Sequence, residues 1–428
     1  MSSEQFLQQV TEYIRSKEAK IHVEKELRHH LKVSKQAWEK RGYSAADAEQ
    51  KAIMEMGSAA KLGKSMNKIH RPKWDFWLIG AICFLILAGF IPVMTFDSSI
   101  MYGDGMQGYF IENKIFHTIV GLLTITILMF YDYRKMQRYS LLLYSLGCLL
   151  LAMLAFMPNT ARNGEAMFAI GPLAISGWSA LPFLLVALAH FFTKPSFKLW
   201  QAMFICLLPI WLILQLPNLA LAFIYTAVMS VLFFFSRFTR KIKQVIGGLS
   251  IAFLGCCILF FDLYANQLAP YQLARLNGFF SPQMYADAEG YDYLNLQKII
   301  ANSGWFGAET PIAFREAHTI YAFVQIIQAV GFGVSIVIIL LLLGVASRIL
   351  WIFRTMPLSF GKMLALAAVA LYSFQSIYSI LMVLGYLPIL EVPLPFISYG
   401  ITPMMLNAIL IGLVLSVYRR KSVMTAES

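Results

Sequence analysis

The chain of 428 residues is 58% hydrophobic and only 14% charged, and its formal net charge at pH 7 is +12. A mean hydropathy of +0.64 excludes an ordinary soluble protein of this size, because such a protein would spread its charges along amphipathic helices. The five cysteines all lie within apolar runs and are typical of small buried apolar residues. Their spacing is not that of a metal site or of an extracellular disulfide framework.

Residues 1–72 precede the first long apolar run and are predicted to form a separate domain. Apolar residues recur among Lys and Glu at roughly helical spacing, and they are Phe6, Val10, Ile14, Ile21 and Leu27. Ser44 followed by Asp47 is typical of a helix start, and Gly57 is typical of a helix end. The pattern predicts a small domain of three or four helices.

From Trp74 onward, apolar runs long enough to cross ~30 Å of hydrocarbon follow one another. In lipid such segments must satisfy their own backbone hydrogen bonds, which predicts an all-α fold class. The predicted spans lie near residues 75–95, 115–131, 140–157, 173–193, 199–214, 218–235, 244–262, 320–346, 363–384 and 401–418. The sequence therefore predicts a polytopic membrane domain with about ten transmembrane helices over residues 73–421, followed by a tail at 422–428.

Charged residues predict the orientation of these spans. Alternate loops are basic, with Arg134, Lys135, Arg138, Lys194, Lys198, Arg237, Arg240, Lys241, Lys243, Arg348, Arg354, Arg419, Arg420 and Lys421, whereas the intervening loops hold most of the acids. By the positive-inside rule both termini are cytoplasmic, which requires an even number of spans. The positive charge thus indicates topology and attraction to anionic lipid, and it does not indicate nucleic-acid binding.

One predicted outer loop, residues 263–319, is much longer than the other connections. It mixes aromatic residues with Pro, Gly and charges, and long loops in compact proteins are usually functional or disordered. Its recurring apolar residues favour an ordered element at the membrane surface. Any chemistry or recognition is expected on this outer face.

Several stretches, in order over most of 74–421, resemble the SEDS family of FtsW, RodA and SpoVE proteins. The most specific is the run Pro393 to Gly400, with the sequence PLPFISYG, followed by Asn407 and Gly412. Others are Tyr271, Gln272, Arg275, Phe279 and Pro282, the run Ser303 to Gly307 with the sequence SGWFG, and Glu316 to Thr319 with the sequence EAHT. Ten spans with cytoplasmic termini is also the topology of that family.

The N-terminal domain has a resemblance of its own. The segments at residues 26–31, 42–48 and 56–57 resemble the short HAAS-like prefix domain found ahead of various bacterial permeases and signalling membrane proteins. The alternative is a solvated helical tether without a ligand.

The SEDS resemblance implies a protein of the bacterial cytoplasmic membrane that acts in cell division or cell shape. Family members polymerise lipid II into glycan strands beside a class B penicillin-binding protein, among divisome or elongasome proteins. A carboxylate could act as general base on the attacking sugar hydroxyl, and cations could hold the pyrophosphate. The matching positions give the candidate substrate-binding residues, namely Tyr271, Gln272, Arg275, His318, Thr319 and Ser398.

Each of three candidates has a structural alternative. His318 could contact a phosphate or sugar, or it could cap the eighth span. Arg275 could contact pyrophosphate, or it could extend to lipid headgroups as interfacial arginines do. Ser398 lacks a base near it in sequence, which favours a role in satisfying backbone groups of an irregular segment.

The sequence departs from the family where catalysis is expected. The segment that ends at Thr319 is followed in the family by an essential aspartate, and here that position is Ile320. Glu316 lies four residues earlier and is the candidate catalytic carboxylate. The Glu–Glu pair in the family's eighth span becomes Gln328–Ala329, and the polar run of the fourth span is also absent. Ionisable groups in a bilayer are unfavourable in free energy and tend to persist only where function needs them. Their loss here indicates a protein that keeps the family fold without catalysis.

Three functions remain open at this point. The preferred one is a SEDS-like protein that binds lipid II or a penicillin-binding protein without polymerising, because Ile320 cannot accept a proton. The alternatives are an active lipid II glycosyltransferase and a transporter of lipid-linked precursors. The residues indicate no metal or nucleotide cofactor, although the family resemblance implies support by a divalent cation.

Overall fold

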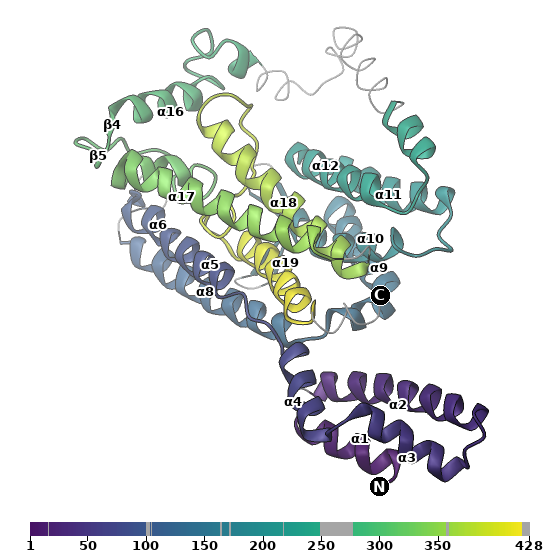
Figure 1. Ribbon diagram of the computed structural model, residues 1–428. Coiled ribbons are helices and arrows are strands. Elements are labelled where there is room, and N and C mark those ends of the chain that lie inside the picture. Colours follow the sequence, from purple (N-terminus) through teal and green to yellow (C-terminus); the bar gives the residue numbers. More distant parts are fainter. Residues whose placement is uncertain are drawn as a thin grey trace. The chain divides into compact units, whose positions relative to one another are not determined.

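The computed structural model describes residues 1–15, 17–99, 103, 105–162, 165–170, 173–216, 218–248, 277–356 and 359–421 (Figure 1). The chain divides into two compact units, Met1–Asp75 with the residues from Val417 on, and Phe76–Ser416. Each unit is described by itself below.

The N-terminal unit contains four helices, α1 (Ser3–Glu12), α2 (Lys17–Lys40), α3 (Ala45–Met56) and α4 (Ala59–Ile69). A capping box of Ser2 and Gln5 starts α1, because each side chain bonds the backbone of the other residue. The predicted start of α3 at Ser44 and its end at Gly57 are confirmed, since Ser44 accepts from the Asp47 N–H and Gly57 has a φ of 77°.

The core of this unit is apolar and includes Phe6, Val10, Ile14 and Leu27, as the sequence pattern predicted. The prediction for Ile21 is wrong, because its side chain is 71% exposed. The helical spacing does not continue from α1 into α2, since α1 ends at Glu12 and a new helix begins at Lys17. Val23, which is 1% exposed, points into the core instead.

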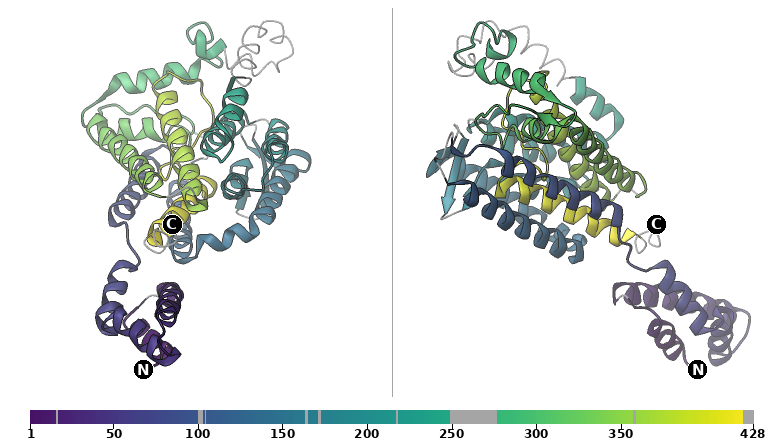
Figure 2. Two further views of the ribbon diagram at one scale, coloured as in Figure 1. Left: turned by 45° about the vertical axis from the view of Figure 1, so that its right-hand side comes forward. Right: turned by 90° about the vertical axis from the view of Figure 1, so that its left-hand side faces the viewer.

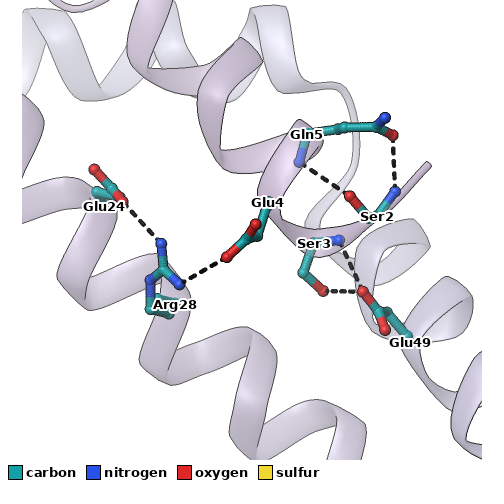
Figure 3. A network of polar contacts seen from close by, with 7 residues as sticks. All are labelled: Ser2, Ser3, Glu4, Gln5, Glu24, Arg28 and Glu49. Atoms are coloured by element: carbon teal, nitrogen blue, oxygen red, sulfur yellow. Dashed lines mark hydrogen bonds and ion pairs between the residues drawn. The ribbon is translucent and has the colours of Figure 1, made fainter.

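Glu49 of α3 bonds Ser3 at the start of α1 (Figure 3) and also pairs with Lys35 of α2. Its carboxylate accepts from the Ser3 N–H at 2.8 Å and the Ser3 hydroxyl at 2.7 Å, and it pairs with Lys35 at 3.2 Å. These hydrogen bonds from Ser3, with the Lys35 amine, lower the pKa of Glu49 from 4.5 to about 2. The ionised carboxylate therefore contributes to the stability of this unit.

We expect Glu49→Gln to destabilise the N-terminal unit by about 1 to 2 kcal/mol at pH 7, since both partners are partly exposed to solvent. Because the folded pKa is the lower one, the contribution is present above pH 4.5 and disappears as pH falls toward 2. Hydrogen exchange of residues 3–56 in the full chain measures the effect. Glu39→Gln on α2 is the matched control, and equal protection of the two variants at pH 7 would contradict the prediction.

The second unit is built from apolar helices, namely α5 (Phe76–Ala88), α6 (Phe90–Thr95), α8 (Gln107–Phe130), α9 (Ser140–Phe156), α10 (Leu181–Phe191), α11 (Leu199–Leu214), α12 (Leu219–Phe235), α17 (Ala322–Arg354), α18 (Phe360–Val383) and α19 (Ile401–Arg419). Short 3-10 helices precede α9 and α10, at Tyr133–Tyr139 and Gly177–Ala180. The predicted span near 244–262 lies outside the described residues after Gly248. Each of the other predicted spans contains an apolar helix.

In the described part of the chain, six helical segments are long and apolar enough to cross a membrane, and α10, α11 and α12 are shorter apolar helices. The predicted all-α, polytopic fold class is confirmed. Helix α18 lies at the centre of the unit and packs against α10, α12 and α17 (Figures 1 and 2). Its burial explains why small residues dominate its first half, from Ala365 to Ala370.

A small antiparallel sheet precedes α10 and corrects one predicted boundary. Its strands are β1 (Thr160–Arg162), β2 (Glu165–Ile170) and β3 (Leu173–Ile175), paired in the order β1-β2-β3. The predicted helix start at residue 173 is wrong, because Leu173 to Ile175 pair with Ile170 to Phe168 of β2. Their backbone groups are satisfied by the neighbouring strand, so the helical segment begins only after Ser176.

The described part of the predicted outer loop is ordered. It contains helix α16 (Tyr291–Asn302), which buries Tyr293, Leu296 and Ile299, and a hairpin of β4 (Ser303–Gly304) and β5 (Gly307–Ala308). Figure 1 shows this hairpin beside the N-terminal end of α17. There α17 is interrupted at Gly331, whose φ of 85° and ψ of 177° are not helical.

Candidate functional site

A cavity of about 430 Å³ opens in the membrane unit where four segments of the chain meet. The start of α8, the residues before α10, the segment before α17 and the segment that joins α18 to α19 all contribute. The lining residues are Met106, Tyr109, Phe110, Asn113, His117, Met167, Ala174, Ser176, Trp178, Glu316, Thr319, Ile320, Glu391, Pro393, Ser398, Tyr399, Gly400, Ile401, Thr402 and Pro403. The site therefore brings together residues that lie almost 300 positions apart.

The segment Pro393 to Gly400 forms one wall of this cavity in an irregular conformation. Phe396 has a φ of 63°, which non-glycine residues adopt rarely, and Gly400 has a φ of 133°. The Leu394 N–H donates to Ser398 Oγ at 2.9 Å, and the Ser398 hydroxyl donates to the Thr319 carbonyl at 2.8 Å. Ser398 thus satisfies backbone groups of two segments, as its structural alternative predicted.

Lys114 of α8 holds the same wall from behind. Its side chain is 3% exposed, and Nζ donates to the carbonyl oxygens of Phe396, Ile397 and Ser398 at 3.4, 3.1 and 3.3 Å. Three acceptors match the three N–H donors of an ammonium group. Gly89, between α5 and α6, also lies close to this turn, since a Cβ there would lie 2.7 Å from the Phe396 carbonyl oxygen. The wall therefore contacts both α8 and the junction of α5 and α6.

His318 lies behind the cavity within a cluster of aromatic rings. Its ring stacks on Phe96 with centroids 4.2 Å apart, and it contacts Phe110 and Tyr399 edge-on at 5.0 and 5.2 Å. The side chain is 1% exposed, and its carbonyl accepts from the Tyr399 N–H at 2.9 Å. His318 packs the Glu316–Thr319 segment against the wall and does not line the cavity.

Glu316 and Ile320 both line the cavity, because the chain turns sharply between them. Glu316 has a φ of 53°, and its carboxylate accepts from the Thr319 hydroxyl. Ile320 presents an apolar side chain at the position where the family resemblance expects an aspartate. A second carboxylate, Glu391, lines the same cavity from the segment after α18. The cavity lining therefore includes two carboxylates and the apolar side chain of Ile320.

The lining residues that the structure describes include no Lys or Arg. A divalent cation held at these carboxylates would attract an anionic substrate group. Magnesium commonly takes one or two protein carboxylates together with phosphate oxygens of its substrate, so Glu316 and Glu391 fit such an ion by donor type. Among the described residues, no group of three or more His, Cys, Asp or Glu could hold a metal by itself.

The predicted site residues divide into three groups in the structure. Glu316, Thr319 and Ser398 meet at one cavity, and His318 lies behind it. Tyr271, Gln272 and Arg275 lie outside the described residues. Their predicted roles in substrate binding stay predictions.

Sequence reasoning missed Lys114, Asn113, His117 and Glu391. The second span was predicted to begin at residue 115, so Asn113 and Lys114 fell before it and His117 fell near its start. The helix in fact begins at Gln107. A lysine and a histidine within an otherwise apolar helix were the available signal, because polar groups at membrane depth are rare without a role. Glu391 was counted only as a loop acid.

Gln328, which replaces a glutamate of the family pattern, bonds the backbone of the outer segment. The Gln328 amide accepts from the Ile312 N–H at 2.9 Å and donates to the Ile312 carbonyl at 3.0 Å. It thereby pairs the segment after the β4–β5 hairpin with α17, as a backbone strand would. At this position the chain uses an amide to fix its outer segment.

Comparison with known proteins places most of the chain in one family. The family model for FtsW, RodA and SpoVE, described as "Cell cycle protein", matches residues 76–423. The probable peptidoglycan glycosyltransferase FtsW of Bacillus subtilis (strain 168) is 26% identical over 368 residues, which cover 78% of this chain and 88% of that protein. The protein of the same name from Geobacter sp. (strain M18) is 24% identical over 360 residues, covering 78% of this chain and 95% of that protein.

Solved structures agree in fold. A chain of a peptidoglycan synthase complex, solved to examine how polymerization and crosslinking are coordinated, aligns with a TM-score of 0.68 at 22% identity and covers 81% of this chain and 98% of its own length. The rod shape determining protein RodA of Thermus thermophilus aligns with a TM-score of 0.58 at 19% identity, covering 81% of this chain and 97% of its own length. Neither alignment extends over the whole chain.

Proposed function

The chain belongs to the FtsW/RodA/SpoVE family of cell cycle proteins, and we propose that it binds lipid II in the cavity walled by Glu316, Glu391 and the Pro393–Gly400 segment, in bacterial peptidoglycan synthesis. The observation that carries this proposal is the cavity itself, because its walls are the segments whose motifs resemble the family. Its polar and aromatic lining suits a sugar–peptide head group, and its place in a membrane protein lets the lipid tail stay in the bilayer.

The proposed orientation follows the distribution of charges. With both termini in the cytoplasm, the segments that carry Glu316 and Glu391 open on the outer face of the cytoplasmic membrane. The proposed lipid-linked substrate would therefore be bound on that face. The proposed partner is a class B penicillin-binding protein, together with divisome or elongasome proteins, and the fold shared with a chain of a synthase complex supports this partner.

We propose that the cavity binds the precursor without polymerising it, because Ile320 stands where the family resemblance expects the aspartate. Polymerisation is the second candidate function, and one observation favours it. Glu316 and Glu391 both line the cavity, so a carboxylate is available there to accept a proton from a sugar hydroxyl. In either case a divalent cation would be held by these two carboxylates and would bring the pyrophosphate to them.

Binding of lipid II to the purified chain, with Mg²⁺ or with EDTA, tests the proposal. We expect Glu316→Gln to weaken Mg²⁺-dependent binding about tenfold, or ~1.4 kcal/mol, because one carboxylate of the pair is lost. Glu309→Gln, an exposed acid of the same loop, is the matched control and is expected to bind as the parent does. Parent protein that binds no lipid II in either condition would overturn the proposal.

The same preparation separates the two candidate functions. The parent, mixed with its penicillin-binding protein and lipid II, is expected to make no glycan strands. Strands made by the parent and lost in Glu316→Gln would establish the polymerase and reject the preferred function.

A further inference from the structure

The β4–β5 hairpin exposes two large apolar side chains at its tip. Trp305 is 66% exposed and Phe306 is 96% exposed, which is the largest exposure of any large apolar residue described. Two adjacent side chains of this size facing water would be unfavourable, so the tip requires an apolar partner.

The tip does not lie on a loose loop, because its backbone is fixed against α17. The Trp305 carbonyl accepts from the Gly333 N–H at 3.4 Å, and it lies 2.2 Å from where a Cβ of Gly331 would be. Gly307 is also close to α17, since its Cβ would lie 3.0 Å from the carbonyl oxygens of Gln328 and Ala329. The hairpin backbone packs against α17 where the helix is interrupted at Gly331. The side chains of Trp305 and Phe306 at the tip of the hairpin remain exposed.

The length of α17 places this contact at the membrane boundary. Arg348, whose guanidinium lies 4.4 Å from the centroid of the Trp351 ring, and Arg354 at the end of the helix mark one bilayer surface. About 20 residues are needed to cross the hydrocarbon core. Counting about 20 residues back from the two arginines reaches Gln328 and Val334, and Gly331 lies between them. The hairpin is therefore level with the opposite bilayer surface.

We propose that Trp305 and Phe306 insert into the interfacial layer of the bilayer and anchor the outer segment of this protein to the lipid surface. Trp is enriched at this depth in membrane proteins, because its ring is apolar and its N–H can reach water or headgroups. The anchor fixes the hairpin at the interruption of α17, a short distance along the chain from Glu316. It is independent of whether the cavity binds lipid II.

Fluorescence of a probe at the tip tests this anchor. The full-length chain, with its cysteines replaced, carries Phe306→Cys labelled with the environment-sensitive dye NBD, and it is placed in nanodiscs of phosphatidylethanolamine and phosphatidylglycerol. We expect blue-shifted emission, several-fold weaker quenching by aqueous iodide, and stronger quenching by nitroxide at carbon 5 of the lipid chain than at carbon 12. Met54→Cys in the N-terminal unit, where the side chain is 69% exposed, is the control and is expected to report water.

A second readout avoids the label. Brominated lipids are expected to quench the Trp fluorescence of the parent more than that of Trp305→Phe, since the substitution removes one indole fluorophore at the interface. Emission at position 306 equal to that at position 54, or a blue shift that appears only when a partner protein is added, would overturn the proposal and assign the tip to a protein contact.

Discussion

Replacing Lys114 with Met is expected to destabilise the membrane unit by about 2 to 4 kcal/mol, because three carbonyl oxygens lose a charged donor while the side chain keeps its volume. The carbonyls belong to the wall of the cavity, so we also expect weaker binding of lipid II. Thermal unfolding in detergent, followed by size-exclusion chromatography, measures the first effect, and binding measures the second.

The controls separate the lost donor from a general effect of removing a cation. Lys198→Met removes a lysine at the start of α11 and is expected to leave the unfolding temperature unchanged. Lys114→Gln keeps two N–H donors and is expected to fall between the parent and Lys114→Met. A Lys114→Met variant as stable as the parent would show that the wall does not depend on this amine.

Replacing Gly331 with Ala is expected to have an effect of similar size, about 3 to 5 kcal/mol. Its φ of 85° and ψ of 177° lie in a region that essentially only glycine occupies. An added Cβ would also lie 2.2 Å from the Trp305 carbonyl oxygen, a backbone atom that cannot rotate away. The hairpin must then leave α17, or the helix must change its course.

Limited proteolysis of the 303–308 hairpin, together with the unfolding temperature, measures this change. Gly333→Ala is a close control, since it lies two residues further along the same helix and its Cβ would meet the Trp305 carbonyl oxygen at 3.4 Å, an ordinary contact. We expect Gly331→Ala to be cleaved faster and Gly333→Ala to resemble the parent. Equal cleavage of the two variants would count against the close approach of hairpin and helix.

The positions of the membrane helices could be predicted well because the signal is local. A run of about 20 apolar residues has to cross lipid wherever it lies in the fold, so composition alone locates it. The first and last residues of the helices were predicted less accurately. Residues 173–175 are apolar enough for a helix, yet they pair with β2, because an apolar run does not distinguish a helix from a strand.

The candidate site could be predicted only where a motif marked it. Glu316, Thr319 and Ser398 stand in motifs, and the structure brings them to one cavity through the hydrogen bond from Ser398 to the Thr319 carbonyl. Lys114 and Glu391 stand in no motif. Their importance comes from what they face, and this depends on how α8 and the segment after α18 are placed.

The order of residues is enough to identify this chain as a membrane protein, to locate most of its helices, and to show which family motifs it keeps or has lost, with Ile320 the clearest loss. These properties follow from the order of residues and from the hydrophobic effect, which acts on each segment separately. The contacts that build the cavity wall and hold the hairpin are visible only in the folded chain. Lys114 donates to carbonyl oxygens more than 280 residues away along the chain. The hairpin packs against the backbone at Gly331, and no sequence pattern in α17 predicts this contact. Contacts between distant segments depend on three-dimensional packing, and a local sequence pattern does not predict that packing.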